Sequence, residues 1–168
     1  MVDTALASLI ENAPVKFNGF AEANAAVVVP FASEDRLNVT FEPGQIDRGT
    51  VTKAVDWISN LSADNRQEAE QALFIEYLSA IEHGSCDFDS AQAQLDWEAE
   101  STGTFSNPVA AESASDIWSL VRLHTVHVQH GLSGELFIDI EGEAAWDGEH
   151  GVALRSKNFG PLAIAKGF

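Results

Sequence analysis

GELFIDIEGEAAWDGEHGVALRS, residues 134–156, is the stretch that decides the fold of this chain. Apolar and polar residues alternate through its first half, which is the period of a strand with one buried face. The apolar positions are Leu136, Ile138 and Ile140. Asp147-Gly148 is a strong turn signal, and the alternation resumes after it. The pattern predicts strands at 135–141 and 151–156, paired antiparallel around a turn at 147–150, with Trp146 buried at the base.

The flanking sequence extends this sheet in both directions. Two strands are predicted at 25–31 and 36–42, joined by the turn ASED, and two more at HTVHVQH (124–130) and PLAIAKG (161–167). Strands at both ends with helices between them favour an α+β fold. We expect a single domain over 1–168, with an antiparallel sheet of about six strands, two N-terminal and about four C-terminal, and two or three helices packed on one face.

Helical periodicity is confined to the middle of the chain. One helix is predicted at 50–59, and a stronger one at 64–83, capped by Asp64 with Gln67 as its reciprocal partner. The acidic, serine- and alanine-rich tract 85–115 is long for a connection, so a short helix near 89–98 followed by a loop is expected there. DIWSLVRL (116–123) predicts a helical turn capped by Asp116.

Charge is the strongest compositional signal. The formal net charge is −17, and between Arg66 and Arg155 the only basic Lys or Arg is Arg122, against seventeen Asp and Glu. Such a surface repels phosphate backbones, which excludes nucleic acid as the expected partner. It favours steered association with a basic protein. Solubility, or adaptation to a salty cytoplasm, is the favoured explanation of the same charge, because net charge bears on solubility before it bears on function.

Nothing in the sequence predicts insertion into a membrane or export. The longest apolar run, 25–31, is far shorter than the ~18 residues that a membrane span needs. The N-terminal residues lack a basic leader, and the single cysteine, Cys86, has no partner for an internal disulfide. We therefore expect a cytoplasmic protein with no membrane association.

Asp147, Glu149 and His150 are the residues most suggestive of a site. Two carboxylates and an imidazole within four positions fit a metal site or an acid–base pair, and they equally fit the polar tip of a hairpin. A metal needs three or four converging ligands, whereas neighbouring side chains at a hairpin tip diverge. The turn interpretation is favoured.

Other candidate sites fail on spacing. His124, His127 and His130 do not share one face of a strand or helix, so they do not predict zinc binding. The stretch from Asp87 to Glu98 begins like a calcium loop but lacks the glycine at its sixth position. Cys86 has no local group to activate it as a nucleophile. No catalytic residue, metal site or cofactor is predicted.

From about residue 25 onward, the order of these segments resembles a family of uncharacterised bacterial α+β domains. The signature of that family is a late W-D-x-E-H-G motif, matched here by five residues: Trp146, Asp147, Glu149, His150 and Gly151. Tract 85–112 and the last dozen residues match least. The resemblance implies a domain of unknown function with an association with toxin–immunity gene neighbourhoods, and it supplies no catalytic residue.

Two functional hypotheses remain. The first is a non-enzymatic, immunity-like interaction protein that binds a basic partner through its acidic hairpin, and its predicted binding residues are Asp139, Glu141, Glu143, Asp147, Glu149 and His150. The second is a small hydrolase or metal-dependent enzyme that uses Asp147, Glu149 and His150 with His124 or His127. The apolar C-terminal strand favours a homodimer, whereas repulsion between acidic chains opposes one, so both states stay open.

Overall fold

The computed structural model describes residues 4–32, 36–84 and 87–165, with the backbone alone at residues 25 and 26. Within these residues the strands form one sheet in the order β1-β2-β3-β4-β5-β6. The strands are β1 (Ala21–Val27), β2 (Leu37–Phe41), β3 (Val121–His130), β4 (Leu136–Ala144), β5 (Asp147–Lys157) and β6 (Leu162–Ile164). The predicted α+β class, with two N-terminal and four C-terminal strands, is confirmed.

The sheet is mixed, because one of its strand pairs is parallel. β2 and β3 run parallel, and each of the other neighbouring pairs is antiparallel. Parallel neighbours require a crossover connection, usually helical. Here the crossover is the long segment between Phe41 and Val121, which carries most of the helices.

Five helices accompany the sheet in the described residues, more than the two or three predicted. They are α1 (Thr4–Glu11), α2 (Arg48–Ser59), α3 (Ala63–His83), α4 (Ala91–Thr102) and the 3-10 helix η1 (Ala114–Leu120). α2 and α3 match the helices predicted at 50–59 and 64–83, α4 matches the short helix expected near 89–98, and η1 matches the helical turn expected at 116–123. The predicted cap of α3 is wrong by two residues, because Ser62 caps the helix and forms a capping box with Asn65.

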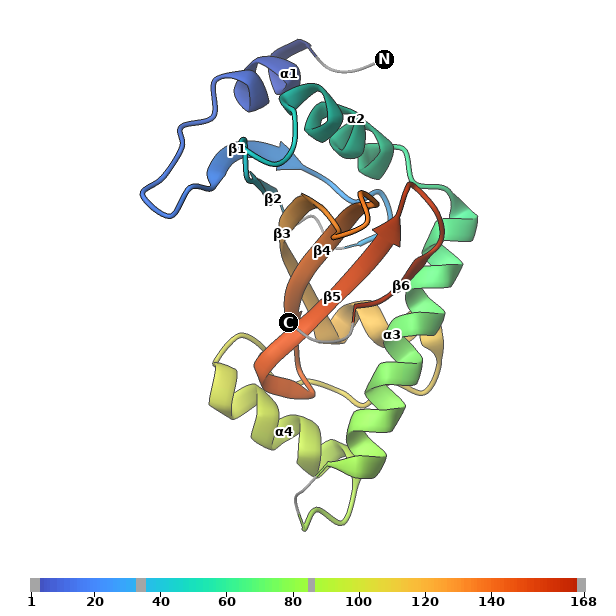
Figure 1. The fold of residues 1–168 in the computed structure, drawn as a ribbon. Helices are drawn as coiled ribbons and strands as arrows, with labels where there is room; N and C mark the ends of the chain where they lie inside the picture. Colours follow the sequence, from blue (N-terminus) through green and yellow to red (C-terminus); the bar gives the residue numbers. More distant parts are fainter. Residues whose placement is uncertain (1–3, 33–35, 85–86, 166–168) are drawn as a thin grey trace.

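The helices occupy different parts of the molecule. α1 and α2 lie near β1 at one end, α3 runs alongside β6, and α4 lies at the opposite end, next to the start of β5 (Figure 1). α2 and α3 contribute to the same apolar core as the inward face of the sheet. The alternation of β4 is confirmed, since Ile138 and Ile140 are fully buried. Apolar burial of this kind contributes about 25 cal/mol per Å² and is the main force that holds the sheet to the helices.

The β4–β5 hairpin forms as predicted, but its turn lies two residues earlier than expected. Ala144 pairs with Asp147, so the turn residues are Ala145 and Trp146, and positions 147–150 belong to β5. The pairing register shifts between Gly142 and Ala144 of β4. The β5 residues opposite this shift form a bulge. The Asp-Gly dipeptide therefore begins β5 directly after the turn and does not make the turn itself.

Some predicted features lie outside the described residues: Cys86, most of the turn at 32–35, and the end of the C-terminal strand. In the described part of the chain, no helix is both long and apolar enough to cross a membrane.

Candidate functional site

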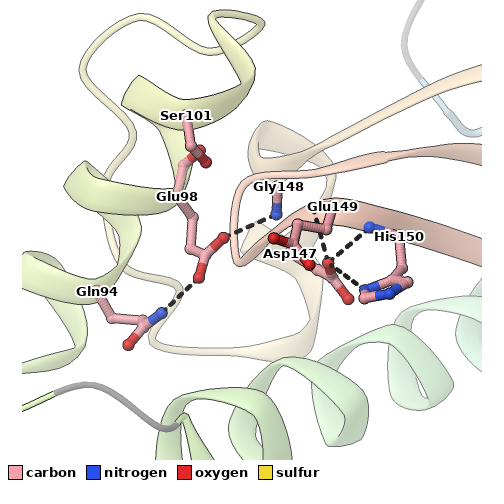
Figure 2. Close-up of polar contacts among 7 residues, drawn as sticks. All are labelled: Gln94, Glu98, Ser101, Asp147, Gly148, Glu149 and His150. Carbon is pink, nitrogen blue, oxygen red and sulfur yellow. Dashed lines mark hydrogen bonds and ion pairs between the residues drawn. The ribbon is translucent and has the colours of Figure 1, made fainter.

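Asp147 organises the beginning of β5 through its side chain. Its Oδ1 atom accepts hydrogen bonds from the backbone N–H groups of Glu149 (3.2 Å) and His150 (2.8 Å) (Figure 2). The same oxygen lies 3.3 Å from Nδ1 of His150. An aspartate that bonds the backbone two and three residues ahead stabilises a local bend. Asp147 therefore shapes the bulge through its Oδ1 atom.

Gly148 is the point of closest approach between the hairpin and α4. Its backbone N–H donates a 2.7 Å hydrogen bond to Oε2 of Glu98, whose Oε1 accepts a 2.8 Å bond from Gln94 (Figure 2). A Cβ atom on Gly148 would lie 2.3 Å from Oγ of Ser101, well inside van der Waals contact. A side chain at Gly148, the x position of W-D-x-E-H-G, would therefore collide with α4 unless Ser101 moved.

Two further residues of the motif have structural roles. Trp146 is 3% exposed, and its ring packs edge-on against Tyr77 of α3, with ring centroids 5.5 Å apart. Gly151 has φ +70°, in the left-handed region that favours glycine, and its Cα faces the carbonyl of Gly142 across the hairpin. The predicted burial of Trp146 is confirmed.

The remaining motif residues, Glu149 and His150, are exposed and stand between two hollows in the surface. The larger hollow, of about 420 Å³, lies where α3, α4 and the start of β5 meet; we call it the α4 cleft. Its lining includes Glu76, His83, Trp97, Glu98, Glu149 and His150. The smaller hollow, of about 320 Å³, includes Glu143 and His124. No Lys or Arg of the described chain lines either one.

The six predicted binding residues are therefore divided. Asp147, Glu149 and His150 line both hollows, and Glu143 lines the smaller one. Glu141, half-buried in the same row of β4, lines neither hollow. Burial raises the pKa of the Glu141 carboxyl, an effect that His127 opposes and Asp139 reinforces.

Asp139 is a correction to the predicted binding surface. Its side chain is 1% exposed and accepts two hydrogen bonds from the guanidinium of Arg155, at 2.6 and 2.7 Å, and one from Gln129 at 3.0 Å. The alternation of side chains along β4 correctly predicted that Asp139 lies on the face away from the apolar core. Side chains from β3 and β5 cover it, so its carboxylate is not presented to a partner.

Sequence reasoning missed the α4 side of the cleft. The only sequence motif that includes Glu98 is the incomplete calcium loop, and no motif distinguishes Glu76, Gln94 or Trp97. The available signal was the spacing of Gln94 and Glu98, which places two polar side chains on one face of a helix. Among the described residues, no group of three or more His, Cys, Asp or Glu side chains is placed to hold a metal ion.

Comparison with known families covers nearly the whole described chain. Residues 11–163 match the family model described as Domain of unknown function (DUF6985). The chain belongs to this family. The match includes α1's last residue, β1 and the tract 85–112, which the sequence motif alone did not connect to a family. No curated protein and no solved structure matches the chain.

Proposed function

We propose that this domain is a non-enzymatic interaction module of the cytoplasm that binds a basic protein through the acidic surface around the α4 cleft. The observation that carries the proposal is the composition of the cleft wall. Glu76, Glu98, Asp147 and Glu149 line it, and neither Lys nor Arg of the described chain does. Carboxylates gathered on one surface attract a basic partner and orient its approach.

The chain-wide charge supports the same proposal. A net charge of −17 extends the attractive field well beyond the cleft. An immunity-like role, in which the domain neutralises a basic partner, is the form that the late W-D-x-E-H-G motif favours.

The competing hypothesis is a hydrolase that uses Asp147, Glu149 and His150. One contact favours it: the 3.3 Å approach of His150 Nδ1 to Asp147 Oδ1 beside the cleft. Against it, the same Asp147 oxygen accepts two backbone hydrogen bonds, and the imidazole side chain is 77% exposed. General bases work best when their environment fixes their orientation and tunes their pKa. The interaction hypothesis is therefore preferred.

The test compares charge reversal at the cleft with an identical change far away. Glu149→Lys alters the cleft wall, and Glu11→Lys makes the same charge change on α1, at the other end of the molecule (Figure 1). Association rates with two folded basic proteins, lysozyme and cytochrome c, are measured from about 20 to about 300 mM salt.

We expect Glu149→Lys to reduce the low-salt association rate about three- to tenfold, and Glu11→Lys to reduce it by less than about twofold. The difference should shrink at high salt because exposed charges are then screened. Equal effects of the two variants at every salt concentration would contradict a docking surface at the cleft.

A further inference from the structure

Glu98 is a buried carboxylate whose hydrogen-bond partners in the described chain are neutral. Its residue exposure is 9%, and its two oxygens accept hydrogen bonds from neutral amides, those of Gln94 and Gly148. In the described chain, no Lys, Arg or His lies within ion-pair distance of it. Removing a carboxylate from water costs free energy that a positive charge at close range offsets. A site that contains such a group favours a cationic ligand.

Trp97 supplies a second, independent feature of the same cleft. Although Trp97 neighbours the buried Glu98 on α4, it is 47% exposed and lines the cleft. The ring of Phe88 lies 6.0 Å from the Trp97 ring, measured between centroids. A half-exposed indole presents a π face to which a cation binds, and a planar guanidinium can also stack on it.

The size of the cleft limits the ligand to something small. At about 420 Å³ it is near the lower end of the range for small-molecule sites, which is roughly 300–1,000 Å³. One long side chain with its flanking backbone fits that volume, whereas a folded element does not. Glu76 of α3 and Glu149 of β5 add negative charge to the lining, in which no Lys or Arg of the described residues takes part.

We propose that the α4 cleft binds one arginine side chain of a basic protein segment, held by the carboxylate of Glu98 and the indole of Trp97. The inference rests on the proposed function and specifies its contact. Arginine is preferred to lysine because its flat guanidinium can bond a carboxylate and stack on an indole at the same time.

The probe is the capped tripeptide Gly-Arg-Gly, compared with its citrulline analogue, which has the same shape but no charge, and with Gly-Lys-Gly. Binding is followed by the tryptophan indole N–H resonances in NMR titrations of the full chain. The arginine peptide should bind at least about tenfold more tightly than the citrulline peptide, and more tightly than the lysine peptide.

A pair of variants distinguishes binding at this site from general attraction to the acidic surface. Glu98→Gln removes the charge and keeps an oxygen that can accept the hydrogen bond of Gly148, while Glu100→Gln makes the same change on an exposed residue of the same helix. Glu98→Gln should weaken arginine-peptide binding about tenfold and Glu100→Gln should leave it within about twofold. Trp97→Ala should weaken it about threefold. Thermal unfolding of each variant checks that the fold is retained.

Two results would overturn the arginine site: equal binding of the arginine and citrulline peptides, or equal effects of Glu98→Gln and Glu100→Gln. If the basic proteins still distinguish Glu149→Lys from Glu11→Lys, docking stands and the arginine site alone is lost. If they do not, but the peptide depends on Glu98, the cleft is a cation site and protein docking is lost.

Discussion

The carboxylate of Glu98 accepts the backbone N–H of Gly148 at 2.7 Å, joining α4 to the β4–β5 hairpin across 50 residues of sequence. Two elements that are not neighbours in the chain are thereby fixed against each other, and the α4 cleft lies at their junction. The geometry of the cleft depends on how closely these two backbones approach.

Gly148→Ala tests that approach. The added methyl group would lie 2.3 Å from Oγ of Ser101, so α4 must move or the serine must rotate away from its bond to the carbonyl of Glu98. Overpacking of this kind destabilises a protein by about 1–3 kcal/mol. Urea unfolding measures the loss.

Two controls accompany this substitution. Gly44→Ala introduces the same methyl group where no atom lies within 4 Å, and it should change stability by less than about 0.5 kcal/mol. Ser101→Ala removes the obstructing oxygen and should restore part of the loss in the double variant. A Gly148→Ala protein as stable as Gly44→Ala would show that α4 does not press on the hairpin.

Trp146→Ala should be among the most damaging single changes in the chain. The side chain is 3% exposed and packs against Tyr77, so its removal leaves a cavity beneath the turn of the hairpin. Truncation of a buried large aromatic residue costs about 3–5 kcal/mol. Trp97→Ala, at a tryptophan that is 47% exposed, is the matched control and should cost less than about 1 kcal/mol. Similar losses at the two sites would argue against the buried position of Trp146.

Asp139→Asn should reduce stability without affecting docking. The substitution removes the charge that Arg155 contacts with two hydrogen bonds, and hydrogen bonds to charged groups contribute about 1.5–3 kcal/mol. The partly exposed Arg155 regains water contacts, which moderates the loss. Glu143→Gln, in the same row of β4 but more exposed, should be nearly neutral. Chemical unfolding of both variants checks the comparison, and a stable Asp139→Asn protein would contradict it.

The success of the sequence in predicting the sheet, and its failure at the turn, have different physical origins. Alternation along β4 reports a local property, the side of the strand on which each residue lies, and it is sufficient to place Ile138 and Ile140 in the core. The Asp147-Gly148 pair reports only that the backbone is permissive there. Its actual use, a close approach to α4, depends on a helix 50 residues away.

The same distinction explains the candidate site. The alternation of side chains correctly predicted that Asp139 lies on the polar face of β4. The exposure of Asp139 depends, however, on Arg155 and Gln129 from the neighbouring strands. Likewise, no local pattern shows that Glu98 is buried, because its cover comes from the hairpin. The sequence predicts that Asp147, Glu149 and His150 lie close together, because they are neighbours in the chain. The α4 residues on the other side of the cleft can be identified only from the tertiary structure.

Self-association through β6 should increase with salt. β6 has three residues at the edge of the sheet, and the N–H of Leu162 already donates to Glu68 of α3, so only a short edge is left for pairing. Salt screens the repulsion between two acidic chains and should therefore favour a homodimer. Light scattering at rising salt measures the molar mass. Ala163→Lys, which places a charge on this edge, should suppress the dimer; a monomer at every salt and protein concentration would end the hypothesis.

Glu141→Gln should stabilise the protein at neutral pH. Burial raises the pKa of Glu141 above its ordinary value of 4.5, so the folded state holds this proton at pH values where the unfolded state has released it. Stability therefore falls as pH rises from the ordinary pKa through the raised one, and above that window the wild-type chain carries the full cost of a half-buried charge.

Gln removes the cost, so the melting temperature of the variant should exceed that of the wild type at pH 7. The two should converge well below pH 4.5, where Glu141 is protonated in both states. Glu149→Gln, at an exposed position, should follow the wild-type curve; the same pH dependence in all three proteins would show that Glu141 ionises without cost.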